Sequence, residues 1–202
     1  MTYCNSSISY PAKFSTRRFG RRELIPTEPA HAWQITTGYV RSFTLEPHDA
    51  VVSLGLWRTG DIIARFVNTI QPYYLECLTP VEVVPVHMAN IKVEELLATH
   101  LQQAQQLVRI LHQTRIETRL TLFLYWLAEQ VGVSATQGIL LDMPLTHQDI
   151  ADALGTTRVT ITRLIKQFQR QGMILHCRRR YILCDTPLPI QAHPSVMHLS
   201  RS

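Results

Sequence analysis

The sequence predicts an α+β chain made of three successive parts: a strand-rich N-terminal region, a pair of helices, and a C-terminal unit of two short helices and a hairpin. Three observations predict this order. Short apolar or alternating stretches, broken by glycine and proline, fill residues 24–88. Apolar residues at helical spacing fill residues 89–133, and two shorter helical patterns separated by a glycine follow from residue 146. A chain of 202 residues is long enough for two hydrophobic cores.

The composition is that of a folded chain without a membrane segment. Hydrophobic residues make up 46% of the chain and charged residues 17%, which is ordinary for a globular protein. No apolar run reaches the roughly 20 residues that a membrane helix needs. Because the polar N-terminus over 1–10 lacks the apolar core of a secretory signal, we expect a cytoplasmic protein that does not bind membranes.

The four cysteines do not form a metal or disulfide motif. They are dispersed, with no CxxC pair and no cysteine–histidine cluster at zinc spacing. We expect four reduced thiols, no metal and no cofactor. Two of them are seven residues apart, so an alternative is that these two face each other across a hairpin. The cysteines are Cys4, Cys77, Cys177 and Cys184, and the close pair is the last two.

The N-terminal region divides into an arm and a sheet domain. Residues 1–23 are polar and end in four arginines, which we interpret as a flexible, solvated basic arm rather than a nucleic-acid contact. The arginines are Arg17, Arg18, Arg21 and Arg22. Residues 24–88 contain many short strand patterns and no helical one, which favours a small sandwich or roll. The expected strands are Ala32–Thr36, Tyr39–Leu45, Ala50–Leu56, Tyr73–Leu78 and Val81–Val86.

Residues 89–133 predict two consecutive helices. In the first, over 89–115, apolar residues alternate between spacings of four and three, which is the seam of a coiled coil. The seam consists of Leu97, Leu101, Ala104, Val108 and Leu111. We favour a homodimer through this seam because the repeat follows 3.5 residues rather than 3.6; the alternative is packing against the β domain. The second helix, from about Ile116 to Val131, has core spacing and ends at Gly132.

Residues 146–171 predict a helix-turn-helix. Thr146 is a natural N-cap, and the first helix runs to about Leu154. Gly155 ends this helix and permits the left-handed backbone of a sharp turn. The second helix, over about 157–171, has an apolar inner face. That face consists of Ile161, Leu164, Ile165 and Phe168.

The outer face of the second helix has the chemistry of a DNA-reading surface. At about 100° per residue, four basic residues share one sector of roughly 140° that holds no acidic residue. A phosphate-lined groove repels carboxylates, whereas a solvated helix normally mixes both signs. We expect base contacts from Arg158, Val159, Thr162 and Arg163. We expect phosphate contacts from Thr146, Thr156, Thr157, Lys166 and Arg170.

A basic hairpin follows Gly172. Residues 173–183 form a pattern of strand, turn and strand, typical of the wing of a winged helix. Its tip carries three arginines, Arg178, Arg179 and Arg180, which we expect to contact the DNA backbone; the alternative is a solvated tip. Residues 146–184 hold seven basic and two acidic residues, so this stretch alone accounts for the net charge of +5.

The whole arrangement resembles the Crp/Fnr superfamily of bacterial transcription regulators. This resemblance implies a β-roll like a cyclic-nucleotide-binding domain, a long dimerisation helix and a C-terminal winged helix-turn-helix. The stretch LTHQDIADALGTTRVTITRL, over 145–164, is particularly similar to the cyanobacterial global nitrogen regulator branch. The resemblance implies that Arg158 and Arg163 contact bases. It also implies a site of the GTA…TAC type, because that branch carries valine at the position of Val159 and the cAMP-receptor branch carries glutamate.

The sensor half departs from the family pattern. Gly60 and Asp61 match a Gly-Asp of the family's cyclic-nucleotide pocket, but residues 62–66 lack the glycine and glutamate that should follow. The roll is shorter than the family's, and the clustered N-terminal cysteines of the iron–sulfur relatives are absent. The resemblance therefore implies a regulator that does not bind cAMP and whose effector is unknown. We interpret Arg41, Arg58 and Arg65 as surface residues rather than as a dicarboxylate site.

These features together predict a sequence-specific DNA-binding transcription regulator that binds a palindromic site as a homodimer. RNA polymerase is a further expected partner if the protein activates transcription. The alternatives are a nonspecific architectural DNA-binding protein, an adaptor that binds proteins, and an enzyme with a site in the β region. None of the nine histidines lies in a catalytic or metal motif, so we expect no catalytic residue. The expected parts are the arm 1–23, the shortened β-roll 24–88, the dimerisation helix 89–115, the winged-helix domain 116–186 and the tail 187–202.

Overall fold

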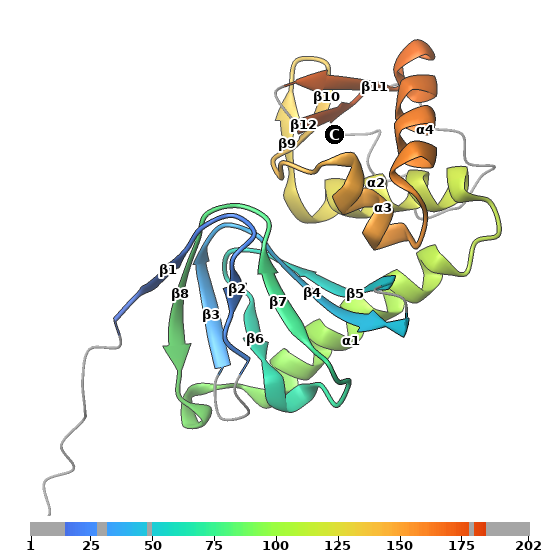
Figure 1. The fold of residues 1–202 in the computed structure, drawn as a ribbon. Coiled ribbons are helices and arrows are strands. Elements are labelled where there is room, and N and C mark those ends of the chain that lie inside the picture. The colour runs from blue at the N-terminus through green and yellow to red at the C-terminus, as the bar shows by residue number, and fades with distance from the viewer. Residues whose placement is uncertain (1–14, 28–31, 48–49, 178–179, 185–202) are drawn as a thin grey trace, which may run out of the picture.

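The chain folds into a β-roll, a long helix along one side of the roll, and a C-terminal unit of helices and strands (Figure 1). The computed structural model describes residues 15–27, 32–47, 50–177 and 180–184. Within these ranges, no helix is long and apolar enough to cross a membrane. The α+β architecture expected from the sequence is confirmed.

The β-roll consists of two antiparallel four-stranded sheets that enclose a core of branched and aromatic side chains. The first sheet has the order β1-β8-β3-β6, formed by Arg17–Phe19, Val81–Val86, Ala32–Thr37 and Ile62–Ala64. The second has the order β2-β7-β4-β5, formed by Leu24–Ile25, Tyr74–Cys77, Val40–Glu46 and Ala50–Trp57. Short 3-10 turns occupy Arg65–Val67 and Met88–Asn90.

The arginine cluster near the N-terminus does not form the solvated arm expected from the sequence. The first two of its arginines lie in β1, which pairs with β8, and the last two lie in the turn that leads to β2. Backbone hydrogen bonds tie this turn to β7: the Arg22 amide donates to the Cys77 carbonyl at 2.8 Å, and the Cys77 amide donates to Glu23 at 2.9 Å. Such short edge strands bury little apolar surface, so no hydrophobic pattern marked them. Residues 1–14 of the expected arm lie outside the described residues.

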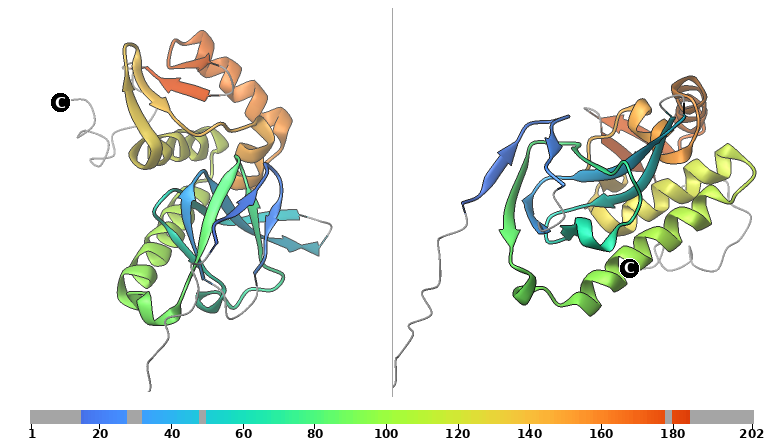
Figure 2. Two further views of the ribbon diagram at one scale, coloured as in Figure 1. Left: turned by 90° about the vertical axis from the view of Figure 1, so that its left-hand side faces the viewer. Right: turned by 60° about the horizontal axis from the view of Figure 1, so that its bottom comes forward.

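Two helices connect the roll to the C-terminal unit (Figure 2). Helix α1, from Val93 to Leu111, packs against the roll and contacts β5. Helix α2 spans Ile116–Val131, the range expected from its apolar spacing, and half of its residues are buried, with the apolar ones in the C-terminal core. The four residues between the helices form the covalent connection between the two halves of the chain.

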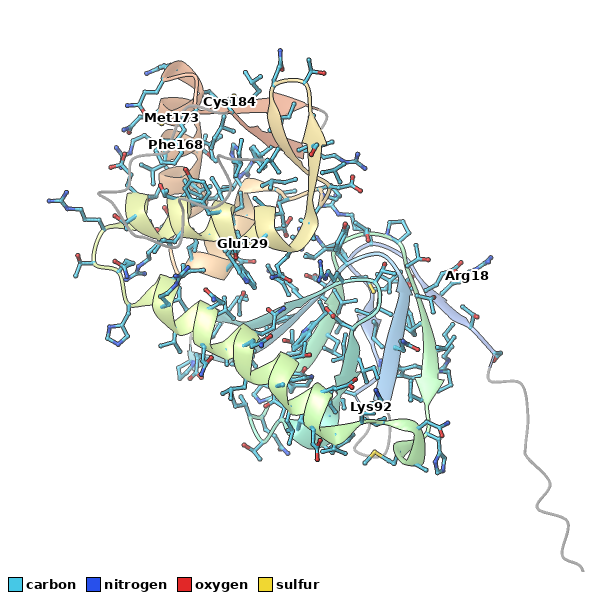
Figure 3. All side chains as sticks on the ribbon, turned by 180° about the vertical axis from the view of Figure 1, so that it is seen from behind. Arg18, Lys92, Glu129, Phe168, Met173 and Cys184 are labelled. Carbon is cyan, nitrogen blue, oxygen red and sulfur yellow. The ribbon has the colours of Figure 1, made fainter. Side chains whose placement is uncertain are left out.

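The C-terminal unit packs α2, α3 and α4 against a small antiparallel sheet. Helix α3 spans His147–Leu154 and α4 spans Arg158–Arg170. The sheet has the order β11-β12-β10-β9, formed by Ile174–Cys177, Arg180–Leu183, Gly138–Leu141 and Gly132–Ala135. Phe168 of α4 lies fully buried in the core of this unit (Figure 3). The β9–β10 hairpin was not expected, because β9 is largely exposed and shows no buried alternation.

Candidate nucleic-acid interface

Helix α3 begins at a complete capping box. The Thr146 hydroxyl accepts a hydrogen bond from the Asp149 amide at 3.2 Å, and the Asp149 carboxylate accepts one from the Thr146 amide at 2.8 Å. This reciprocal pair satisfies amides that the first turn of a helix leaves free. At the other end, Gly155 has φ 61° and ψ 47°, the left-handed conformation that the turn requires. The helix boundaries expected from the sequence are therefore confirmed.

Helix α4 separates an apolar inner face from a cationic outer face. The four apolar residues expected to face inward are all buried. The basic residues of the outer face are exposed, Thr162 is half-buried, and Val159 reaches 78% exposure although it is apolar. Within the described residues, no carboxylate pairs with any basic residue of this face. These basic residues are Arg158, Arg163, Lys166 and Arg170.

A histidine that the sequence did not single out orients one of the expected base-contacting residues. The Thr162 hydroxyl donates a hydrogen bond to the Arg158 carbonyl at 2.8 Å and lies 2.8 Å from Nδ1 of His147. Because the hydroxyl proton is engaged, His147 donates through Nδ1–H. This contact joins the first residue of α3 to the middle of α4, across 15 residues of sequence with no recognisable motif.

The N-terminal ends of α3 and α4 border a shallow hollow of about 360 Å³. Its lining includes His147, Arg158, His176 of β11 and Tyr181 of β12. The pKa of His147 is lowered, first by burial and then by the positive charges of His176, Arg158 and Lys166. The hollow therefore combines basic side chains with the positive end of a helix dipole, which suits an anion such as a phosphate group.

The expected phosphate-contacting residues differ in how far the fold leaves them free. The Thr146 hydroxyl is engaged in the capping box, and the Thr157 hydroxyl caps α4 by accepting from the Thr160 amide at 3.2 Å. Thr156 lies half-buried in the turn between the helices. Arg180 pairs with Asp142 at 2.9 Å on the surface. The other two wing arginines, Arg178 and Arg179, lie outside the described residues.

The wing hairpin does not bring its two cysteines together. In the register of β11 and β12, Cys177 lies opposite Arg180. Cys184 follows β12, and its amide donates to the Met173 carbonyl at 2.9 Å, at the opposite end of the hairpin. The alternative that these cysteines face each other is therefore wrong, because the strand register places them at opposite ends of the hairpin.

The three arginines considered for a dicarboxylate do not converge. Arg58 donates to the Gln130 carbonyl, and Arg65 donates to the Asn68 carbonyl. Arg41 is not the surface residue that we expected: it is only 7% exposed and pairs with two carboxylates. Among the described residues, no group of three or more histidine, cysteine or acidic side chains has the arrangement of a metal site.

Helix α1 carries two adjacent apolar rows with different surroundings. One row, which includes Leu96, Leu107 and Ile110, is buried. The neighbouring row is the predicted seam, where Leu101 and Val108 are 59% and 60% exposed. The remaining seam residues are Leu97 and Ala104, which are exposed, and Leu111, which is half-buried. The helix thus packs against the roll, as the alternative proposed, and still leaves the seam uncovered.

Comparisons with known proteins agree with this geometry. The model of the Crp-like helix-turn-helix domain matches residues 118–187. The chain is 40% identical over 171 residues to "Regulatory protein CysR" of Synechococcus elongatus, covering 83% of this chain and 82% of that protein. It is 30% identical over 180 residues to the "Global nitrogen regulator" of the same organism, covering 80% and 81% of the two chains.

Solved structures share the fold. The crystal structure of TTHB099, a transcriptional regulator of the CRP family from Thermus thermophilus, matches with a TM-score of 0.70 at 23% identity. The match covers 83% of this chain and 91% of that one. FixK2 from Bradyrhizobium japonicum also matches with a TM-score of 0.70, at 22% identity over 84% of this chain and 91% of the other.

Proposed function

This chain belongs to the Crp/Fnr family and is a DNA-binding transcription regulator of that type; from this premise we propose that it binds a palindromic site as a homodimer, with α4 of each subunit in a major groove. The observation that carries the proposal is the outer face of α4. It exposes four basic residues and Val159 and pairs none of them with a carboxylate of the described residues. A helix of this width and charge fits the major groove of B-DNA.

We assign base reading to the N-terminal half of α4. Arg158 and Arg163 have the fork geometry that binds O6 and N7 of guanine. Val159 and the methyl group of Thr162 offer apolar contacts for a thymine methyl, and the engaged hydroxyl of Thr162 supports that role. The valine also supports half-sites of the GTA…TAC type, which is the finer part of the proposal.

The remaining basic groups are assigned to the DNA backbone. The hollow beside His147 and Arg158 suits a phosphate group. Lys166 and Arg170 lie further along the exposed face of α4, where they position the helix without reading bases. We assign further backbone contacts to the wing arginines Arg178, Arg179 and Arg180, the first two on the sequence alone.

We assign the contact between the two subunits to the exposed apolar row of α1. A continuous row of Leu97, Leu101, Ala104 and Val108 at 3.5-residue spacing fits the same row of another copy. Two-fold symmetry then requires half-sites about one helical turn apart. RNA polymerase becomes a partner if the protein acts as an activator.

Competition between selected and random DNA tests the base-reading assignment. Sites are first selected from random duplexes with the full chain, and affinities are then measured by fluorescence anisotropy. We expect Arg163→Ala to weaken binding to the selected site by about 1–3 kcal/mol and to change binding to random DNA far less. Arg170→Ala is the matched control, because it removes the same charge from the same helix and should weaken both duplexes alike. An equal loss for Arg163→Ala on both duplexes contradicts base reading, and equal wild-type affinity for both indicates a nonspecific binder.

A further inference from the structure

An ion-pair network joins the roll to the first helix of the helix-turn-helix. Arg41 of β4 places Nε 2.6 Å from Glu76 of β7 and a terminal nitrogen 2.7 Å from Asp152 of α3. Arg22 lies 3.0 Å from the same Glu76 and 2.6 Å from Asp149 of α3. One carboxylate of the roll therefore holds two arginines, and each arginine reaches a different acidic residue of α3.

The setting of Arg41 makes its geometry demanding. Its side chain is 8% exposed, and the carboxylates of Glu76 and Asp152 are each 13% exposed. A buried arginine that loses a partner leaves an uncompensated charge in a poorly hydrated interface. The pair consequently holds only while α3 stays at one distance and one angle from the roll.

Arg22 is held in a backbone conformation that its residue type disfavours. It occupies the third position of the turn 20–23 with φ 72°, where glycine or asparagine is usual. Burial lowers the pKa of Arg22, but Asp149 and Glu76 raise it more, so the net pKa is above its ordinary value. An arginine at this position reaches the carboxylate of Asp149 on α3, which accounts for its presence where glycine is usual.

The two acidic residues of α3 connect the network to DNA reading. Asp149 is 4% exposed and closes the capping box of α3, so the arginines hold the end from which this helix starts. Helix α3 packs directly on α4, and Figure 1 shows α3 on the side of the C-terminal unit nearest the roll. The covalent connection runs elsewhere, through the residues between α1 and α2.

We propose that Arg22 and Arg41 are positioning residues, which fix the orientation of α4 relative to the dimer helix so that the dimer accepts only one spacing between half-sites. This inference rests on the proposed function, because it needs a dimer that reads two half-sites. Adding one base pair rotates the second half-site by about 34°, since one turn takes roughly 10.5 base pairs. Two recognition helices that are held rigidly cannot both contact their half-sites after that rotation, whereas two helices on mobile hinges can.

A set of palindromes with altered spacing tests the inference. The full-length dimer is titrated with duplexes whose central spacer is one base pair shorter, unchanged, or one or two base pairs longer. For the wild type we expect about a tenfold or greater preference for the best spacer. For Arg41→Gln and Arg22→Gly we expect the preference to shrink to about threefold, with binding to a single half-site unchanged. Arg22→Gly removes the ion pairs while relieving the left-handed backbone, so it separates positioning from loss of fold.

Two further variants serve as controls. Arg18→Gln removes an arginine from the same N-terminal segment, but Arg18 lies in the edge strand β1 and pairs with half-buried Glu82 of β8, away from α3, so it should keep the wild-type preference (Figure 3). The double variant Arg41→Gln, Asp152→Asn should show the same spacing preference as Arg41→Gln alone, because Arg41→Gln has already removed the contact with Asp152. If Arg41→Gln is unstable, Asp152→Asn takes its place.

The outcomes separate the two proposals. A wild type that binds selected and random DNA equally, or that shows no spacing preference, removes the proposed function and this inference with it. A wild type that prefers one spacer, with Arg22 and Arg41 variants that keep the same preference, overturns the inference alone. Tighter binding of Arg41→Gln to the best spacer also overturns it, because the network would then hold α4 in the wrong orientation.

Discussion

Arginines lie on the outer face of α4, and other arginines contact the acidic residues of α3, but their surroundings are opposite. Arg158 and Arg163 are exposed, and no carboxylate of the described residues pairs with them, whereas Arg22 and Arg41 each touch two carboxylates. An unpaired surface cation keeps its charge available for a polyanion. A paired cation, such as partly exposed Arg22 or buried Arg41, supplies geometry instead. The placement of the acidic residues, more than that of the arginines, therefore distinguishes the proposed DNA-reading face of α4 from the holding face, formed by Arg22, Arg41 and their partners on α3.

The largest effect expected from this comparison is on stability. Arg41→Met should lower the free energy of unfolding by about 3 kcal/mol, because it leaves Asp152 without its cationic partner in the interface. Arg163→Met removes the same charge from the exposed face and should change stability by no more than about 0.5 kcal/mol. Urea unfolding followed by circular dichroism measures both. Equal losses of unfolding free energy in the two variants would contradict the difference in stability contribution between Arg41 and Arg163.

A smaller effect is expected when an acid is placed on the reading face. Val159→Glu should weaken binding to the selected duplex by about 2 kcal/mol, because it adds a negative charge that faces phosphates and removes an apolar contact. Val159→Ala should cost less than about 1 kcal/mol, because it only shortens the contact. Anisotropy titrations at one salt concentration compare the two variants. Unchanged affinity of Val159→Glu would show that this position does not face DNA.

The smallest effect concerns the pH dependence of binding. The pKa of His147 in the free protein is lowered by burial and by the neighbouring cations His176, Arg158 and Lys166. DNA phosphates offset those cations, so the pKa rises on binding and the complex takes up a proton. Affinity should therefore increase by about threefold as the pH falls from about 7.5 to about 6. His147→Asn should lose this dependence and His176→Asn should retain most of it; a flat wild-type profile contradicts the assignment.

The geometry of the outer face of α4, which we propose reads DNA, could be predicted from the sequence because its signals are local. The cap at Thr146, the left-handed Gly155 and the inner apolar row of α4 lie within about two dozen residues, and each follows from backbone geometry and periodicity. The charge sorting on α4 needed only the angle between successive residues. The existence of α1, with its exposed seam, followed from the same kind of argument.

The holding face could not be predicted, because the two residues of each of its ion pairs to α3 are distant in sequence. Arg22 and Asp149 are 127 positions apart, and Arg41 and Asp152 are 111 apart. Arg17 and Arg18 lie in an edge strand too short to show a hydrophobic pattern, and Arg21 and Arg22 lie in the turn after it, so these arginines had the composition of a solvated tail. The contact between His147 and Thr162 was equally hidden, because it depends on how α3 crosses α4.

The same network has a consequence for the order in which the chain assembles. Every strand of the roll precedes residue 87, whereas the acidic residues of α3 are synthesised later. At about 5–20 residues per second, a ribosome needs several seconds to reach them, which is time enough for an N-terminal domain to fold. Within the roll, Glu76 pairs with both Arg22 and Arg41, so one positive charge is left over for the acidic residues of α3. The roll is thus a docking platform formed ahead of time, and α3 completes it on emerging from the ribosome.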